Sequence, residues 1–512
     1  MSSSTSSNNK RIAKNTLLLY FRMLFLMLIS LYTSRVILNA LGVEDYGIYN
    51  AVGGVVTMFS MLSGSLNAAI SRFITFELGK GDTEKLKSVF SSSVTIQGGI
   101  ALIIVILAET VGLWFLNEKM VIPENRLTAA NWCFQFSIIT FAINLISVPY
   151  NAAIIAHEKM SAFAYISIFE AVGKLAIAWL VIVNPIDRLI FYAGMVAILA
   201  IVIRFIYGWY CKRYFEECTY HFVYDHDLLK HMFGFAGWNF IGSSATILRD
   251  HGGNIILNIF FGPAVNAARA IAVKVNSVLV GFVTNFMTAL NPQITKSYAS
   301  GNREYMMELL TQGARLSFYM LLLISLPVLL NTNYLLVAWL KVIPEHTVLF
   351  VQLTLILAMH ECLAYPLTTA MLATGKIKKY QIIAGGLNLL NLPVAYACLV
   401  VGMIPESVVI VAIIFSVLVQ MVRLWLLRFM INLNVRKFLV NVYGNISVVL
   451  LFAVLIPCYF NSSMEEGGLR FIFISILAMI TTIASELFVG CSKNERAFVL
   501  NKIKTIIRNK RH

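Results

Sequence analysis

Charged residues are scarce in this sequence, and acidic residues are scarcer than basic ones. Only 13% of the 512 residues are charged while 59% are hydrophobic, and 25 acidic residues stand against 40 basic ones. A soluble protein of this length needs more polar surface than that. The hydrophobic residues form runs of roughly 20 or more, long enough to cross a ~30 Å hydrocarbon core as helices. Short alternating strands typical of an outer-membrane barrel are absent. The sequence therefore predicts an all-α integral membrane protein.

Patterns that bind metals, form disulfide frameworks or catalyse reactions are also lacking. The seven cysteines show no CxxC or Cys/His spacing, and most lie in apolar runs, where cysteine is a small hydrophobe. No loop carries a carboxylate pair or a nucleophile elbow. The longest predicted outer segment, 332–346, has 15 residues, too few for the active-site loop of a membrane polymerase or ligase. We therefore expect no metal, no cofactor and no enzymatic activity.

The apolar runs and the polar residues between them predict about fourteen transmembrane helices. The predicted spans are 15–40, 47–76, 88–116, 127–156, 161–183, 188–211, 232–260, 264–292, 306–331, 347–373, 378–400, 406–431, 437–460 and 469–490.

Basic residues show which loops face the cytoplasm. With the N-terminus inside, the inner segments hold 25 Lys and Arg residues and the outer loops hold 5. Basic residues accumulate on cytoplasmic loops, and one miscounted span would invert every later loop. We therefore predict a bacterial inner-membrane protein with both termini cytoplasmic, and we ascribe the net charge of +15 to topology, not to nucleic-acid binding. Residues 1–14 form a predicted disordered leader. The basic tail 491–512 either lies along the anionic leaflet or is a solvated anchor.

Three motifs recur at nearly constant spacing. An inner-loop motif, IT-x5-G-[D/N]-x-E, begins at Ile74 and again at Ile294. The outer-loop motif VIPE occurs at 121–124 and again at 342–345. The offsets of these two motifs are 220 and 221 residues, and a third motif, P-x3-A-x2-A-x2-K, recurs at an offset of 217. Three matches in the same order indicate an internal duplication.

The duplicated unit contains six predicted spans, so both copies enter the membrane the same way up. This predicts a parallel repeat: a lobe at 15–212, a lobe at 226–431 and a central cavity that opens by alternating access. The last two spans, 437–490, have no counterpart and form a predicted accessory pair.

Ten basic residues lie inside predicted spans, where each costs at least ~2.5 kcal/mol at the bilayer centre unless it is paired or hydrated. They are Arg22, Arg35, Arg72, Lys174, Arg204, Arg249, Arg269, Lys274, Arg315 and Arg423. Arg72, Arg204, Arg315 and Arg423 lie near predicted cytoplasmic ends, where long side chains can reach water. We interpret these four as structural.

Four deeper cations are candidates for substrate binding: Arg35, Arg249, Arg269 and Lys274. Few acidic residues in the spans could neutralise them. Such an excess is tolerable if the cations face a hydrated cavity that receives an anion, and arginine suits phosphate through bidentate hydrogen bonds. We therefore predict a cavity for an anionic, phosphorylated substrate. Scattered salt bridges between helices are the alternative.

Acidic residues inside the spans are candidates for ion coupling or for pairing. Asp250 directly follows Arg249, and Glu170 lies four residues before Lys174, so the latter two can pair on one helix face. Whether that pair is structural or functional stays open. Glu109 is predicted to be either a counter-ion or a protonatable site.

Two further features of the spans carry predictions. The pair Gly252-Gly253 permits either a bend or close packing of the helix that contains it. His360 and Glu361 adjoin in another span, and we expect them to form hydrogen bonds between helices.

Two blocks of sequence resemble a known family. YTSRVILNALGVEDYGIYNAVGGVV (32–56), followed by LNAAISRFITFELGKGD (66–82), resembles the opening of bacterial polysaccharide-export flippases. FGFAGWNFIGSSATILRDHGGNIILNIFFGPAVNAARAIAVKVN (233–276) resembles the start of their second half. These flippases belong to the multidrug/oligosaccharidyl-lipid/polysaccharide exporter superfamily, whose fold is two six-helix lobes around a central cavity.

The resemblance implies translocation of undecaprenyl-diphosphate-linked oligosaccharide, such as an O-antigen repeat unit, to the outer leaflet. It also implies membrane lipid, a polysaccharide polymerase and glycosyltransferases as partners. Arg35 (in TSRV) and Arg269 (in AARA) match cavity arginines of the related lipid II flippases, whereas Arg249 and Lys274 are chosen by depth alone. A drug/cation antiporter of the same superfamily is the alternative, although acidic cavities and twelve spans are usual there.

Overall fold

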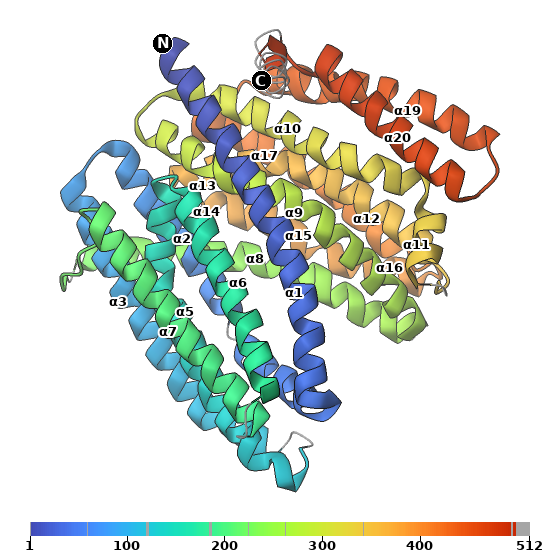
Figure 1. The fold of residues 1–512 in the computed structure, drawn as a ribbon. Helices are drawn as coiled ribbons and strands as arrows, with labels where there is room; N and C mark the ends of the chain where they lie inside the picture. Colours follow the sequence, from blue (N-terminus) through green and yellow to red (C-terminus); the bar gives the residue numbers. More distant parts are fainter. Residues whose placement is uncertain are drawn as a thin grey trace, which may run out of the picture. The chain divides into compact units, whose positions relative to one another are not determined.

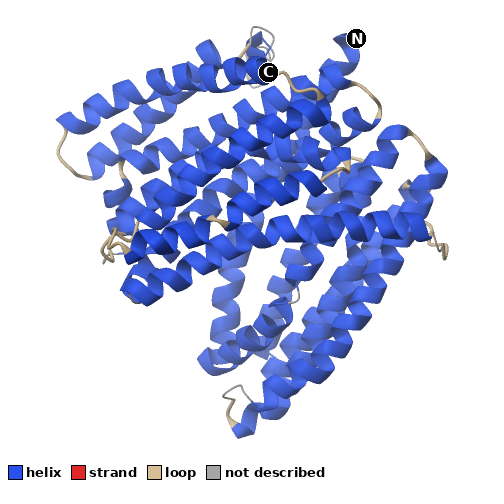
Figure 2. Cartoon of the chain, turned by 180° about the vertical axis from the view of Figure 1, so that it is seen from behind, coloured by secondary structure: helices blue, strands red, loops and turns tan. Residues whose placement is uncertain are grey.

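The structure, a computed structural model, is built from helices joined by short connections (Figures 1 and 2). It describes residues 2–58, 60–118, 122–183, 187–223, 225–261, 263–340, 343–492 and 495–497. Within these ranges there is no β-strand. The prediction of an all-α protein is therefore confirmed for the described part of the chain.

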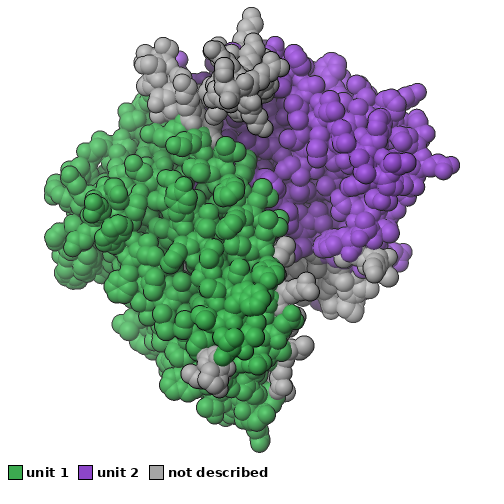
Figure 3. All heavy atoms as spheres, in the orientation of Figure 1, with its two compact units in different colours: residues 1–240, 291–302 green, residues 241–290, 303–512 purple. Residues whose placement is uncertain are grey.

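Contacts divide the chain into two compact units, which are coloured separately in Figure 3. Unit 1 consists of Met1–Phe240 and Asn291–Asn302, and unit 2 consists of Ile241–Leu290 and Arg303–His512. The division cuts through α8 (His226–Phe261) and α9 (Pro263–Ala299), so each of these helices contributes residues to both units. The predicted lobes instead place both helices wholly in the second half.

Unit 1 is made of long helices and short turns. Besides the parts of α8 and α9 its elements are α1 (Ser2–Met58), α2 (Ser60–Lys80), α3 (Thr83–Leu107), the π-helical turn η1 (Ala108–Gly112), α4 (Leu113–Glu118), the 3-10 turn η2 (Glu124–Arg126), α5 (Leu127–Ala156), α6 (Met160–Val183) and α7 (Arg188–Tyr214).

Unit 2 contains the remaining helices. They are α10 (Arg303–Leu330), α11 (Thr332–Leu340), α12 (Thr347–Glu361), η3 (Cys362–Ala364), α13 (Tyr365–Thr374), α14 (Lys378–Tyr380), η4 (Gln381–Gly385), α15 (Gly386–Leu389), α16 (Asn391–Val400), α17 (Ser407–Ile431), α18 (Val435–Phe438), η5 (Leu439–Gly444), α19 (Asn445–Ser463), α20 (Gly468–Ser485) and η6 (Glu486–Gly490).

Eleven helical segments of the described chain are long and apolar enough to cross a membrane. They coincide with eleven of the predicted spans. The other three predicted spans, 15–40, 47–76 and 232–260, fall on α1, α2 and α8, which are also helical. The protein is therefore a multi-pass membrane protein, and the count of fourteen stays a prediction.

The first helix differs from its prediction at its N-terminal end. It begins at Ser2, so the segment 1–14 that we predicted to be disordered is helical from its second residue. Extending a helix that already exists costs little, unlike starting one, which explains this continuation of the first apolar span. Near the other end the helix is interrupted at Gly42, whose φ is 79° and ψ 170°. That interruption lies between the first two predicted spans.

The sequence repeat has a counterpart in the backbone. Gly81, after α2, and Gly301, after α9, have φ values of 79° and 77°, the left-handed conformation that commonly ends a helix. They are 220 residues apart, like the motif that contains them. The residue after Gly81, Asp82, caps α3 by accepting a hydrogen bond from the Lys85 amide. The duplicated motif is therefore a helix end followed by a helix start.

Unit 1 has a core in which small residues bring helices together. Ala153 and Ala156 of α5 are fully buried in it, and small residues allow close approach of helices inside a membrane. Phe90 of α3 packs edge to face on Tyr150 of α5, with ring centroids 5.1 Å apart. This core holds α5, and Glu158 lies in the turn that follows it.

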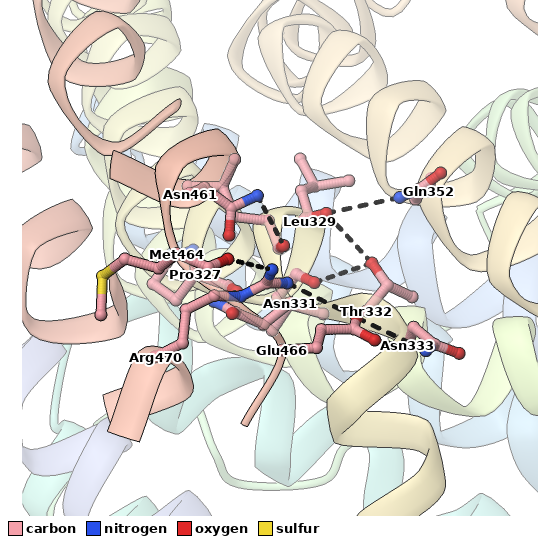
Figure 4. A network of polar contacts seen from close by, with 12 residues as sticks. Pro327, Leu329, Asn331, Thr332, Asn333, Gln352, Asn461, Met464, Glu466 and Arg470 are labelled. Carbon is pink, nitrogen blue, oxygen red and sulfur yellow. Dashed lines mark hydrogen bonds and ion pairs between the residues drawn. The ribbon is translucent and has the colours of Figure 1, made fainter. Parts of the chain in front are cut away.

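The accessory pair of helices, α19 and α20, lies side by side and packs on α10 (Figure 1). A polar network joins its turn to the end of α10 (Figure 4). Asn461 donates from Nδ2 to the Leu330 carbonyl over 3.4 Å, and Asn333 donates to Glu466 over 3.3 Å. The Arg470 guanidinium donates to the carbonyl of Met464 over 3.1 Å. These contacts attach the accessory pair to α10 and α11 within unit 2.

Candidate functional site

Arg249, one of the four candidate cations, forms an ion pair. Its Nη1 lies 2.6 Å from Oε1 of Glu361, and the side chains are 13% and 31% exposed. The pair links α8 to the end of α12. The neighbouring His360 contacts Ser416 of α17, with 2.7 Å between Nδ1 and Oγ. The expected bonds between helices are therefore present for both His360 and Glu361.

Arg269 lies in α9 and is only 8% exposed. Its guanidinium packs on the backbone of α8 at Gly253. A Cβ at Gly253 would lie 2.3 Å from Nη1 and 2.8 Å from Nη2 of Arg269, closer than any real contact. The absence of a side chain at Gly253 is therefore what makes room for this guanidinium.

The two adjacent glycines of α8 serve packing, not bending. The helix is continuous through them from His226 to Phe261. A Cβ at Gly252 would lie 2.7 Å from Cδ2 of Leu392, so this glycine admits an apolar side chain as Gly253 admits Arg269. Of the two interpretations that the sequence left open, the structure supports close packing.

Lys274 differs from Arg269 in its surroundings. It is exposed, and it has no carboxylate partner in the described part of the chain. The two residues are five positions apart on α9, which places them about 140° apart around the helix axis. The structure therefore does not bring these two cations onto one face. The side chains of Arg35 and Asp250 lie outside the described residues.

The acidic candidates of unit 1 are hydrogen-bonded. Glu170 and Lys174 form the predicted pair on α6, with 2.7 Å between Oε1 and Nζ, and both are about half exposed. Glu109 lies in η1 and accepts a hydrogen bond of 3.0 Å from Gln135. A π-helical turn inside a helix is often found at functional sites, so the position of Glu109 agrees with a functional role without requiring one.

The arginines that we interpreted as structural have aromatic or carboxylate neighbours. The guanidinium of Arg204 lies 3.8 Å from the ring centre of Tyr150, and that of Arg72 lies 4.4 Å from the ring of Phe76. Such cation–π contacts strengthen when water is excluded. Of the other two, Arg315 forms an ion pair with Glu495 and Arg423 donates a hydrogen bond to Tyr380. Arg22, which is not one of the four, packs on the ring of Phe163.

Sequence reasoning missed a cluster around Glu158, in the turn between α5 and α6. The Glu158 cluster consists of Arg11, Asn15, Glu158, Gln293 and Lys296, all in unit 1. Arg11 Nε and Lys296 Nζ each lie 2.8 Å from the carboxylate, whose side chain is 1% exposed. Gln293 donates over 2.6 Å, and Asn15 donates to the Glu158 carbonyl over 3.4 Å. Arg11, Glu158 and Lys296 come from three segments that were each predicted to be cytoplasmic.

A second missed network joins three predicted outer loops of unit 1. Arg126 donates to Asp45 and to Asp187, with 2.6 Å in each ion pair. Burial raises the pKa of Asp187, but hydrogen bonds from Arg126 and from the amides at the start of α7 lower it more, so the net pKa lies below its ordinary value. In unit 2 the corresponding helix starts are joined by His346 and Glu406, 2.7 Å apart.

Solved structures with this fold are membrane transporters. The Vibrio cholerae MATE transporter VcmN in the bent form superposes with a TM-score of 0.70 and 18% identity, covering 86% of this chain and 100% of that one. A multidrug resistance MATE family transporter of the MOP superfamily, in an outward-facing conformation, gives 0.69 at 12% identity, covering 83% and 96%. A MOP superfamily transporter from Pyrococcus furiosus, described as having a binding pocket of reverse polarity, gives 0.68 at 13%, covering 83% and 96%. The chain therefore shares the fold of these transporters.

The family to which the chain belongs follows from its sequence. Residues 12–298 match the family described as polysaccharide biosynthesis protein, and the chain belongs to it. The uncharacterized membrane protein EpsK of Bacillus subtilis (strain 168) is 19% identical over 304 residues, which is 58% of this chain and 59% of that protein. The chain is therefore a multi-pass membrane protein of a family linked to polysaccharide biosynthesis.

Proposed function

We propose that this protein is a transporter. It is a fourteen-span flippase that moves undecaprenyl-diphosphate-linked oligosaccharide from the inner to the outer leaflet of the bacterial inner membrane. Both termini are cytoplasmic in this proposal. In this proposal Arg35, Arg249, Arg269 and Lys274 contact the diphosphate at different steps of alternating access, because Arg269 and Lys274 lie on different faces of α9. In the same pathway glycosyltransferases act before it and a polysaccharide polymerase acts after it.

The observation that carries the proposal is the surroundings of Lys274. It lies 11 residues after Pro263, the first residue of α9, about 16 Å along the helix axis. It is exposed, and no carboxylate in the described residues neutralises it. An ammonium group inside a span is costly in lipid, and the proposal therefore places Lys274 on a hydrated face that receives an anion.

Two arginines supply the bidentate donors that a phosphate needs. Arg269 packs closely on the backbone at Gly253, which restricts its guanidinium and reduces the entropy lost on binding. Arg249 is paired with Glu361 in this state, so phosphate binding at Arg249 requires exchange of one anion for another. Such exchange makes the pair sensitive to whether substrate is present.

The test is complementation of a bacterial strain that lacks its own flippase. Lys274→Ala and Arg269→Ala should each lower surface polysaccharide by about tenfold or more, because hydrogen bonds to charged groups contribute ~1.5–3 kcal/mol. Lipid-linked oligosaccharide should accumulate in the inner leaflet. Lys379→Ala, which removes an exposed lysine of α14, is the matched control and should complement fully.

Two outcomes would overturn the proposal. If Lys274→Ala and Arg269→Ala both leave surface polysaccharide unchanged at equal protein levels, the cations do not bind the substrate. If the wild-type protein fails to complement but lowers the accumulation of a cationic dye, it is a drug antiporter instead. Purified protein in vesicles that contain lipid-linked oligosaccharide distinguishes direct transport from an indirect effect.

A further inference from the structure

Glu158 has an unusual backbone conformation for its residue type. Its φ is 58°, in the left-handed region where L-residues other than glycine are strained. The third repeated motif aligns Glu158 with Gly375 at the offset of 217, and Gly375 has a φ of 73°. Glycine adopts this conformation without steric cost. The first repeat therefore keeps a side chain at a turn where glycine would be less strained.

The contacts of that side chain account for its presence. Both carboxylate oxygens are used: Lys296 contacts Oε1, while Arg11 and Gln293 contact Oε2. A buried carboxylate is stable only when its charge and lone pairs are satisfied in this way. The Glu158 side chain is therefore fixed by partners that come from α1 and from α9.

The partners from α9 lie at its far end. Residues of α9 up to Leu290 belong to unit 2, whereas Gln293 and Lys296 belong to unit 1. The same end of α9 touches α2, because a Cβ at Gly79 would lie 2.8 Å from the Lys296 Cα. The last turns of α9 are therefore held within unit 1 by the Glu158 carboxylate and by the contact at Gly79.

We propose that the Glu158 cluster is an ion-pair lock on the end of α9, closed in the state seen here and open in another state of the transport cycle. The lock is reversible for a physical reason. Lys296 and Arg11 are 24% and 50% exposed, and these segments are predicted to be cytoplasmic, so water can solvate the separated charges. A lock within the hydrocarbon core would lack that solvation.

The experiment measures how often the end of α9 separates. Ser297 is 6% exposed, so Ser297→Cys reports opening through its reaction with a maleimide added from the cytoplasmic side of inverted vesicles. Cys398, Cys458 and Cys491, the cysteines that are not buried in the described part of the chain, are replaced by serine. The variant with these three cysteines replaced and Ser297 intact gives the labelling rate that comes from the buried cysteines.

Glu158→Gln removes the charge and keeps the shape. It should raise the labelling rate at position 297 by roughly tenfold or more, because the lost bonds are charge-assisted, and lower transport. Glu84→Gln breaks the exposed pair with Lys87, 3.1 Å long, and is the matched control with no expected effect. Glu158→Gly relieves the backbone strain, which offsets part of the cost of the lost bonds, and it should label as fast as Glu158→Gln.

Equal labelling of the wild type and Glu158→Gln would overturn the lock, and so would an equal rise in Glu84→Gln. If Glu158→Gln does not reach the membrane, Glu158→Gly and Lys296→Met open the lock from its two sides. Unchanged labelling in both means that the cluster is only structural. This readout needs no substrate, so a failed flippase assay would leave the result on the lock intact.

Discussion

Replacing Gly253 by alanine tests whether the position of the Arg269 guanidinium matters for transport. The added Cβ would lie 2.3 Å from Nη1, 2.8 Å from Nη2 and 3.0 Å from Cζ of Arg269. Ordinary contact distances are about 3.5 Å, so the guanidinium must retreat by roughly 1 Å. A retreat of that size breaks a directed bidentate contact with phosphate, and we expect transport to fall about tenfold, equivalent to ~1.4 kcal/mol.

The same substitution should not unfold the protein. Alanine is favoured over glycine inside a helix by about 1 kcal/mol, and the clash is with the flexible end of a long side chain, which can move. We therefore expect an unchanged or slightly raised melting temperature in detergent alongside the loss of transport. Opposite signs in the two measurements distinguish a positioning effect from a folding defect.

Gly252→Ala is the matched control for Gly253→Ala. It adds the same methyl group to the same helix, but toward Leu392 at 2.7 Å, an apolar neighbour with no proposed role in binding. We expect it to change stability and to leave transport per folded molecule near the wild-type level. If Gly253→Ala transports normally, or if both substitutions lower transport equally, the reasoning about Arg269 is refuted.

Three further predictions concern stability, measured as melting temperature in detergent. Glu361→Ala should cost about 1–3 kcal/mol because it leaves Arg249 without the carboxylate that it contacts, and Arg249→Met in the same chain should recover part of this; a larger loss in the double variant would contradict the pairing. The pKa of Asp187 is lowered by folding, so its contribution is complete above its unfolded value of 3.8 and is lost as the pH falls through the lower folded value. Asp187→Asn should therefore destabilise at pH 7 and converge with the wild type in strong acid, and a constant difference between the two would disprove this. Gly375→Ala should cost about 1–2 kcal/mol because its φ is 73°, whereas Gly467→Ala, with open space around its Cβ and a φ of 177°, should have little effect.

Local features of the fold could be predicted from sequence, because their signals are local. Apolar runs determine where helices cross the membrane, and eleven of the predicted spans recur in the structure. The repeated G-[D/N] dipeptide marks a helix end, and Gly81 and Gly301 share the same backbone conformation. Periodicity also predicted the pair of Glu170 and Lys174, since four residues return to the same helix face.

Long-range pairs could not be predicted, because no local pattern encodes them. Glu361 lies 112 residues from Arg249, and Lys296 lies 138 residues from Glu158. The glycines at 252–253 were ambiguous for a related reason: a bend and a close contact both require a missing side chain, and only the neighbouring helix decides between them. The predicted leader was misread because a polar composition does not stop a helix from extending.

The unequal turns at Glu158 and Gly375 have an evolutionary consequence. A transporter assembled from two identical polypeptides would carry the same residue at both positions. It would therefore have the Glu158 lock twice or not at all. Within a single chain the two positions are free to differ, and here one is glutamate and the other is glycine. With this asymmetry the proposed Glu158 lock occurs once in each molecule. Substitutions at the lock can therefore change the transport rate without changing the residues proposed to bind the substrate.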